Sequence, residues 1–175
     1  EFSSIAAGIE AVDAMLKEAP VRAALARPVS PGKYLVLVTG DVDSVKAAVC
    51  AGRAGPADVL VDELLLPAAH PGVFAALSGP VRVRELDAGG VIETTSAAAA
   101  IVAADRAVKA ASVTLLDLRL ANGLGGKGYV TLTGEIGDVR ESVAAGAGSA
   151  AERGLLTRQV VIARPHPDLL RELLP

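Results

Sequence analysis

The stretch SPGKYLVLVTGDV occupies residues 30–42, and a second stretch, LGGKGYVTLTGEI, occupies residues 124–136. Each contains Gly-Lys, then a run of strand-forming residues, then Thr-Gly followed by an acidic and a branched apolar residue. A phosphate-binding loop would explain one such stretch. A duplicated domain would explain both, and it would indicate a different kind of function.

The similarity between the two halves extends beyond these stretches. When the chain is shifted against itself by 92 residues, residues 1–21 align with residues 93–113, and ten of the twenty-one positions are identical. A slip of two residues brings the Gly-Lys and Thr-Gly pairs into line, and two more align His70-Pro71 with His166-Pro167. Solenoid repeats recur every 20–50 residues, so this longer spacing indicates two successive domains.

Both halves show the same predicted order of elements. Ser4 and Ser96 are suited to cap a helix, and apolar residues recur behind Ser4 at helical spacing. A strand, the Gly-Lys loop, a strand, a helix, a third strand and a short helix opened by His-Pro follow. In the second half GVIE adds a strand at the start, of which only Glu1-Phe2 remains in the first half. The predicted strands are 21–27, 34–39 and 59–66, then 90–93, 113–120, 129–133 and 158–163; the predicted second helices are 42–54 and 136–151.

The order β-α-β-β-α-β is that of the split βαβ, or ferredoxin-like, fold. The predicted fold class is therefore α+β, with two ferredoxin-like domains in tandem. We expect the first domain over residues 1–79, with its first strand truncated, and the second over residues 90–175. Residues 80–89 match neither copy and are expected to link the two domains.

The composition excludes several classes of function. The net charge of −3 and the small number of aromatic residues, two Tyr and two Phe, argue against nucleic-acid binding, which needs clustered cations and exposed rings. No apolar run approaches the roughly 20 residues that span a bilayer, and no signal peptide is visible. A single Cys excludes an intrachain disulfide and a Cys-rich metal site.

The Gly-Lys loops do not fit a nucleotide-binding loop. A Walker loop needs Ser or Thr after the Lys because that hydroxyl holds Mg²⁺. Here Tyr34 follows Lys33, and Gly128 follows Lys127. The glycines of the second loop, at 123, 125, 126 and 128, are instead expected to supply positive φ angles and close backbone approach.

The remaining polar residues favour structural roles. His70 and His166 stand at the same place in each copy, before Pro, where capping or packing is expected rather than catalysis. Cys50 falls in the middle of a predicted helix and is expected to be a small buried apolar residue. No acid–His–nucleophile set is visible, so an enzyme is not expected. Two pairs at helical spacing, Asp13 with Lys17 and Asp105 with Lys109, are expected to be exposed and worth a few tenths of a kcal/mol each.

Several motifs resemble those of bacterial microcompartment shell domains. They are DAMLK and DRAVK, PGK and GGKG, TGD and TGE, and IARPHPDLL. The tandem arrangement resembles the trimeric shell proteins with two such domains per chain, and three longer stretches resemble in particular the T-type shell proteins of propanediol-utilisation compartments: SSIAAGIEAVDAMLK, SPGKYL and ADRAVKAASVTLLDLRLANGLGGKGY. The resemblance covers essentially the whole chain.

The resemblance implies a structural protein rather than an enzyme. It implies a flat, pseudohexameric homotrimer that tiles with other hexameric, trimeric and pentameric shell proteins. Together they would form the shell of a bacterial microcompartment in the cytoplasm. The partners implied include neither nucleic acid nor membrane.

The resemblance also implies roles for particular residues. Lys17 and Lys109 would lie at the edges of the tile, and Arg164 would hydrogen-bond across the same seam. The first copy has Ala68 where Arg164 would fall, so half of the edges would lack that contact. The loops before Gly-Lys would line a central pore for small polar metabolites; their residues are Val29, Ser30, Pro31 and Gly32, alternating with Gly123, Leu124, Gly125 and Gly126.

One position departs from the family pattern. Some members have Cys just before Pro-Gly-Lys, and three copies of it hold an iron–sulfur cluster in the pore. This chain has Ser30 at that position, so neither an iron–sulfur cluster nor another cofactor is expected. The alternative hypothesis is a duplicated ferredoxin-like regulatory domain that binds a nucleotide or small effector at subunit clefts through its glycine loops.

Overall fold

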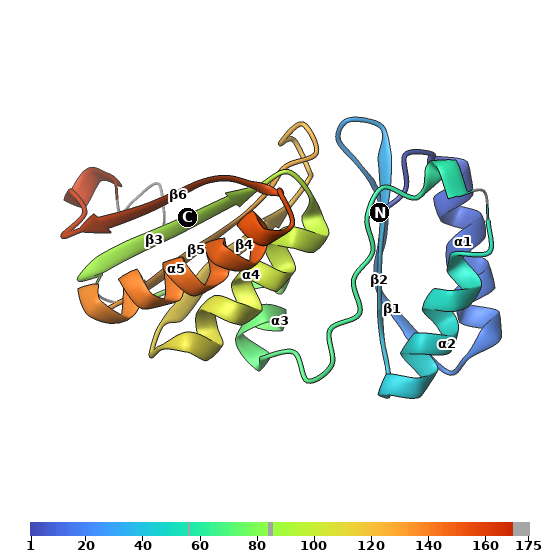
Figure 1. Ribbon diagram of the computed structural model, residues 1–175, viewed down its shortest axis with the longest axis horizontal. Coiled ribbons are helices and arrows are strands. Elements are labelled where there is room, and N and C mark those ends of the chain that lie inside the picture. The colour runs from blue at the N-terminus through green and yellow to red at the C-terminus, as the bar shows by residue number, and fades with distance from the viewer. Residues whose placement is uncertain (56, 84–85, 170–175) are drawn as a thin grey trace. The chain divides into compact units, whose positions relative to one another are not determined.

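The computed structural model describes residues 1–55, 57–83 and 86–169, and the chain divides into two compact units, Glu1–Pro67 and Ala68–Pro175 (Figure 1). Unit 2 carries the complete fold. Its antiparallel sheet has the order β4-β5-β3-β6, with β3 (Ala88–Thr94) and β5 (Gly128–Gly134) in the centre. The outer strands are β4 (Thr114–Leu120) and β6 (Leu156–Ala163). The first of the four strands begins two residues before the predicted strand 90–93.

Two helices cover this sheet. Helix α4 (Ala97–Ala110) and helix α5 (Ile136–Glu152) pack against each other on the same side of it (Figure 1). Ser96 caps α4 as predicted, accepting a hydrogen bond from the N–H of Ala99 at 3.1 Å. The chain order β3-α4-β4-β5-α5-β6 confirms the predicted split βαβ fold in this half.

Unit 1 repeats this plan with a shorter sheet. It comprises α1 (Ile5–Glu18), β1 (Arg22–Val29), β2 (Lys33–Thr39), α2 (Val42–Gly52) and a 3₁₀ turn, η1 (Ala57–Val59). Strands β1 and β2 pair antiparallel, with a bulge between Ala23 and Leu25. The equivalent positions of β4, Leu115 and Asp117, carry the same bulge. Because bulges change strand twist locally, both copies share even this detail of their backbone.

The central and last strands of unit 1 are reduced to single bridges. Phe2 pairs with Tyr34 on one side and with Leu60 on the other. Thr94, at the position equivalent to Phe2, pairs with Gly128 and Leu156 in the same way. The predicted strand 59–66 is therefore wrong apart from this bridge. In the described residues the other backbone hydrogen bonds of this segment to residues 1–3 involve Val59, Val61 and Asp62, and the N–H of Val61 donates to the carbonyl of Glu1 at 2.8 Å.

A helix–strand contact is solved differently in the two copies. A Cβ on Gly8 would lie 2.5 Å from the Cβ of Tyr34, so helix α1 needs glycine where strand β2 carries a large residue. In unit 2 the helix carries Ala100 and the strand carries Gly128, where a Cβ would lie 2.7 Å from that of Ala100. Interiors are close-packed, so each copy leaves room at one of the two positions.

Helix α3 (Pro71–Ser78) begins at the His-Pro of the first copy but belongs to unit 2. It packs against β4 and α4, as Figure 1 shows. In the second copy the helix opened by His166 is described only over its first turn, residues 167–169. None of the helices in the described residues is long and apolar enough to cross a membrane.

Candidate functional site: loops and edges of the two copies

The first Gly-Lys loop is the short turn between β1 and β2. Val29 ends β1 and is buried, with 4% of its surface exposed. Ser30 is half-buried, whereas Pro31 and Gly32 are exposed at the tip. Gly32 has φ of 76°, a value that glycine adopts without strain. The polar Ser30 and the exposed Pro-Gly tip are therefore the parts of this loop that a ligand or another subunit can reach.

The second loop, between β4 and β5, is longer and is built from two successive turns. The N–H of Leu124 donates to the carbonyl of Ala121 at 3.3 Å, and the N–H of Lys127 donates to that of Leu124 at 3.1 Å. The N–H of Ala121 donates to the carbonyl of Lys127 at 2.9 Å and closes the loop. Gly123 and Gly125 are exposed at its surface, and Leu124 is half-buried.

The predicted role of the glycines in this loop is confirmed. Gly123, Gly125 and Gly126 have φ of 72°, 61° and 90°. Gly128 lies in β5, where a Cβ would approach the carbonyl oxygens of Ser96 and Arg119 within 3.2 and 3.3 Å. Positive φ and close backbone approach thus account for the glycines without a bound phosphate.

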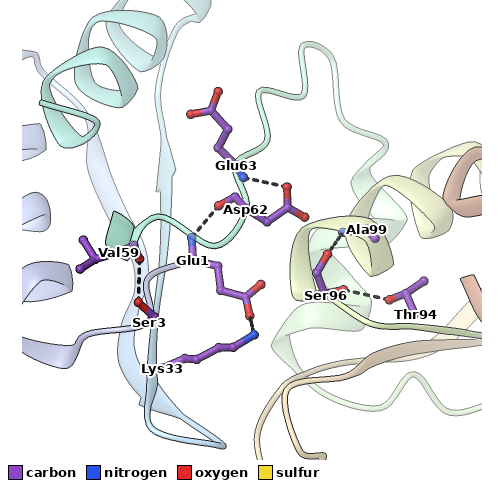
Figure 2. A network of polar contacts seen from close by, with 9 residues as sticks. All are labelled: Glu1, Ser3, Lys33, Val59, Asp62, Glu63, Thr94, Ser96 and Ala99. Carbon is purple, nitrogen blue, oxygen red and sulfur yellow. Dashed lines mark hydrogen bonds and ion pairs between the residues drawn. The ribbon is translucent and has the colours of Figure 1, made fainter. Parts of the chain in front are cut away.

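The lysines of both Gly-Lys motifs are held by a glutamate of their own copy. Lys33 Nζ lies 2.8 Å from Glu1 Oε1, whose side chain is fully buried, and Figure 2 shows the pair. Lys127 Nζ lies 2.7 Å from Glu93 Oε1. These pairs were not predicted from the sequence, because their partners lie 32 and 34 residues apart. Because each ammonium is engaged by a carboxylate, these lysines anchor the loop to the central strand.

The two Asp–Lys pairs on the first helices differ in environment. Lys17 Nζ and Asp13 Oδ2 are 2.6 Å apart, with 75% and 62% of the side chains exposed. Lys109 Nζ and Asp105 Oδ2 are also 2.6 Å apart, but only 40% and 4% are exposed. The prediction of two exposed pairs is therefore right for the first copy and wrong for the second.

The buried carboxylate of Asp105 has two polar partners, His70 and Lys109. Its Oδ1 accepts a hydrogen bond from the N–H of His70 at 2.8 Å. Lys109, which neutralises Oδ2, also donates to the carbonyl of Ala68 at 2.9 Å. The segment that leads into α3 is thereby fastened to α4, which is what buries Asp105.

The His-Pro segments have the structural role predicted for them. His70 Nδ1 accepts from the N–H of Gly72 at 3.1 Å, and His166 Nδ1 accepts from the N–H of Asp168 at 3.2 Å. Two residues earlier, Ala68 and Arg164 both have positive φ, 51° and 47°. The exposed Arg164 therefore stands on the same backbone conformation as its counterpart Ala68.

The outer strand of unit 2 carries an ion pair that unit 1 lacks. Arg119 Nε lies 2.6 Å from Oδ2 of the buried Asp117. This hydrogen bond and the charge of Asp117 raise the pKa of Arg119, so the guanidinium stays charged. The equivalent residues of β1 are Leu25 and Arg27, so the two copies present different surfaces beside their loops.

The residues do not fit an iron–sulfur cluster. Such clusters are bound by thiolates, and the loop position concerned is occupied by the hydroxyl of Ser30. The chain's Cys, Cys50, is exposed on α2 rather than buried as predicted. Within the described residues no group of three or more His, Cys, Asp or Glu is arranged to hold a metal ion.

A pocket of about 210 Å³ lies in unit 1 between α1 and α2, away from the glycine loop. Sites for drug-sized ligands usually occupy about 300–1,000 Å³. Its lining combines small residues, such as Ala11 and Gly52, with the larger apolar Phe2 and Leu60 and with one acidic and one basic side chain. The charged side chains are those of Glu10 and Arg53. The regulatory-domain hypothesis requires a ligand that contacts the glycine loops. A ligand in this pocket would not contact them.

Two copies of one α+β fold whose polar residues fasten loops and termini define a duplicated structural domain. A family model described as the BMC domain matches residues 1–69 and 88–165, so the chain belongs to the BMC-domain family. It is 45% identical over 173 residues to the bacterial microcompartment shell protein PduT of Citrobacter freundii, across 99% of this chain and 94% of that relative.

Two further comparisons bear on the duplication. The shell protein PduA of Salmonella typhimurium is 38% identical over 91 residues, covering 51% of this chain and 92% of the relative. A crystal structure of a microcompartment protein from Desulfitobacterium hafniense superposes with a TM-score of 0.88 at 49% identity, covering 97% of this chain and 94% of that one. The chain is thus a tandem BMC-domain protein of the bacterial microcompartment shell and not an enzyme.

Proposed function

We propose that three copies of this chain form a flat, pseudohexameric tile with a central pore. The observation that carries the proposal is that the two copies share fold, register and bulge but differ in their loops. Three chains with two such domains supply six similar units around a threefold axis. The repeat limits proposed for the domains are 1–79 and 90–175, with residues 80–89 between them.

The proposed pore is lined by the two Gly-Lys loops in alternation. Ser30, Pro31 and Gly32 offer a hydroxyl and exposed backbone, and the second loop offers exposed glycine backbone at Gly123 and Gly125. Backbone amides and hydroxyls form hydrogen bonds without a net charge, which suits small polar metabolites. The full set proposed to line the pore is Val29, Ser30, Pro31, Gly32, Gly123, Leu124, Gly125 and Gly126.

Light scattering and electron microscopy test the tile itself. At micromolar concentration the purified chain is expected to have the mass of a trimer, and at high concentration to form sheets, tubes or hexagonal arrays. Dispersed monomers in both measurements would contradict the proposal. Dispersed trimers would support the proposed ring but contradict the proposed tiling with other hexameric, trimeric or pentameric shell proteins.

Arg164 provides a test of the proposed tile edge, where Lys17 and Lys109 are also placed. Arg164→Ala is expected to leave folding and trimer mass unchanged, because Ala68 already occupies the same positive-φ conformation in the first copy. Ordered sheets seen by electron microscopy should be lost or reduced. The reciprocal change, Ala68→Arg, adds the guanidinium to the other edges and should restore or extend ordered arrays. If the Arg164→Ala variant forms sheets as ordered as those of the wild type, Arg164 does not contribute to contacts at the tile edge.

Ser30 provides a test of the proposed pore. A hydroxyl is a hard, neutral ligand, so the wild-type protein should be colourless and hold no cluster. If three loops converge at the axis, Ser30→Cys should bring three thiolates together and bind one iron–sulfur cluster per trimer after anaerobic reconstitution. Iron, sulfide and visible absorption measure this. A folded trimeric variant that stays colourless would place Ser30 away from the axis.

A further inference from the structure

The tail of the first copy does not return to its own unit. Residues 68–78 pack on α4 and β4 of unit 2, where His70 N–H and Lys109 Nζ form the hydrogen bonds around Asp105 described above. The contact continues beyond the helix, because the N–H of Val81 donates to the carbonyl of Leu116 at 2.6 Å. The outer strand and first helix of unit 2 are thus covered by a segment from the preceding repeat.

Within unit 1, as far as the structure describes it, no segment covers the equivalent surface. Its outer strand β1 exposes Ala23, Ala24 and Ala26, whereas their counterparts in β4 are buried leucines, Leu115, Leu116 and Leu118. On the helix, Leu16 is exposed, whereas its counterpart Val108 lies beside Gly72 of α3. Asp13 and Lys17 are exposed to solvent. Their counterparts in unit 2, Asp105 and Lys109, form hydrogen bonds with the segment 68–70.

The tail of the second copy has the same chemistry as that of the first and is exposed. Arg164 repeats the positive φ of Ala68, and His166 repeats the Nδ1 cap of His70. The side chains of His166 and Asp168 are 74% and 71% exposed, and Leu169 is exposed as well. Its counterpart surface on unit 2 is already occupied by residues 68–81.

From this we infer that the segment Arg164–Leu169 of one copy docks on the α1–β1 surface of a second copy. In this contact the N–H of His166 donates to Asp13, and Lys17 Nζ donates to the carbonyl of Arg164. The contact repeats between chains the one that residues 68–70 make with Asp105 and Lys109 within a chain. It rests on the proposed trimer and identifies how its chains are joined.

A second copy is the partner because the contact runs in one direction. Each tail contacts the next repeat, and a head-to-tail contact of this kind forms a ring when its rotation closes, as it does in the proposed trimer. In a two-domain chain, the tail of the first repeat packs on the second repeat of the same chain. The tail of the second repeat must therefore pack on the first repeat of another chain.

Two matched pairs of variants test the contact by sedimentation over a range of concentrations. Asp13→Ala should raise the dissociation constant of the trimer by at least about tenfold, as expected for a lost hydrogen bond to a charged group. Asp43→Ala should have no effect; Asp43 is another exposed acidic residue of unit 1 with its own lysine partner, and its side chain is 94% exposed against 62% for Asp13. His166→Pro removes the N–H donor and should match Asp13→Ala, whereas His166→Ala keeps the donor and should assemble like the wild type.

Proline is compatible with this position, because His70, the counterpart, has φ of −65°. Amide hydrogen exchange of residues 163–169 supplies a second readout: protection is expected in the trimer and should be lost in Asp13→Ala. Trimers unaffected by both Asp13→Ala and His166→Pro would overturn the contact and leave the trimer standing. Protection that persists in dilute monomers would also overturn it, by placing the tail on its own chain. A wild type monomeric at every concentration would overturn the trimer itself.

Discussion

Replacing Gly146 by alanine is expected to lower the free energy of unfolding of unit 2 by about 1–3 kcal/mol, the usual range for overpacking. Gly146 lies where α5 crosses α4, and a Cβ there would come within 2.5 Å of the carbonyl oxygen of Ala103 and 2.6 Å of Ile92 Cδ1. The carbonyl belongs to the backbone of a buried helix and cannot move alone. The two helices must therefore separate, and chemical denaturation measures the loss.

Two other glycines serve as controls for Gly146. Gly148 lies in the same helix with no atom near its missing Cβ, so Gly148→Ala should stabilise by up to about 1 kcal/mol through helix propensity. Gly52 is the counterpart of Gly146 in the first copy, but there a Cβ would meet the side chain of Met15 at 2.8 Å. A flexible thioether can move aside, so Gly52→Ala should cost less than Gly146→Ala. Equal losses at Gly146 and Gly148 would refute the packing explanation.

Replacing Asp105 by alanine is expected to lower the free energy of unfolding of unit 2 by about 2–4 kcal/mol, because hydrogen bonds to charged groups contribute about 1.5–3 kcal/mol each. The change removes the acceptor for the N–H of His70 and the partner of Lys109. Helix α3 should then detach from α4, and amide exchange over residues 68–78 should rise. Lys109→Ala should also destabilise, since it leaves the carboxylate of Asp105 buried without its cation.

The equivalent change in the first copy, Asp13→Ala, is the comparison for Asp105→Ala. Asp13 and Lys17 are exposed, and exposed pairs contribute at most about 1 kcal/mol. The loss in Asp105→Ala should be the same at every protein concentration, because the contact lies within one chain. Any loss in Asp13→Ala should instead depend on concentration, as stability gained through association does. A stability of Asp105→Ala equal to that of the wild type would show that Asp105 does not hold the tail.

The repeat in the sequence was sufficient to predict the fold. The features that were predicted correctly depend on residues close together in the chain. They are the helix spacing behind Ser4, the Ser96 cap, the glycines of the second loop and the His-Pro caps. Such patterns act through the backbone conformation of a few neighbours, and the structure confirms them. The motifs that both halves carry resemble those of shell domains, and the match to the BMC-domain model confirms that resemblance.

The tertiary structure decided which of two similar residues is buried. Asp13 and Asp105 have the same local sequence pattern, yet only Asp105 lies beneath a segment that is 35 residues away along the chain. The pairing of Lys33 with Glu1 and of Lys127 with Glu93 spans 32 and 34 residues. The predicted strand at 59–66 matched strand propensity, but in the described residues its pairing with the start of the chain is limited to Glu1, Phe2 and Ser3. Local patterns determine backbone conformation, whereas burial and pairing depend on which distant segments arrive, and that is decided only when the whole chain packs.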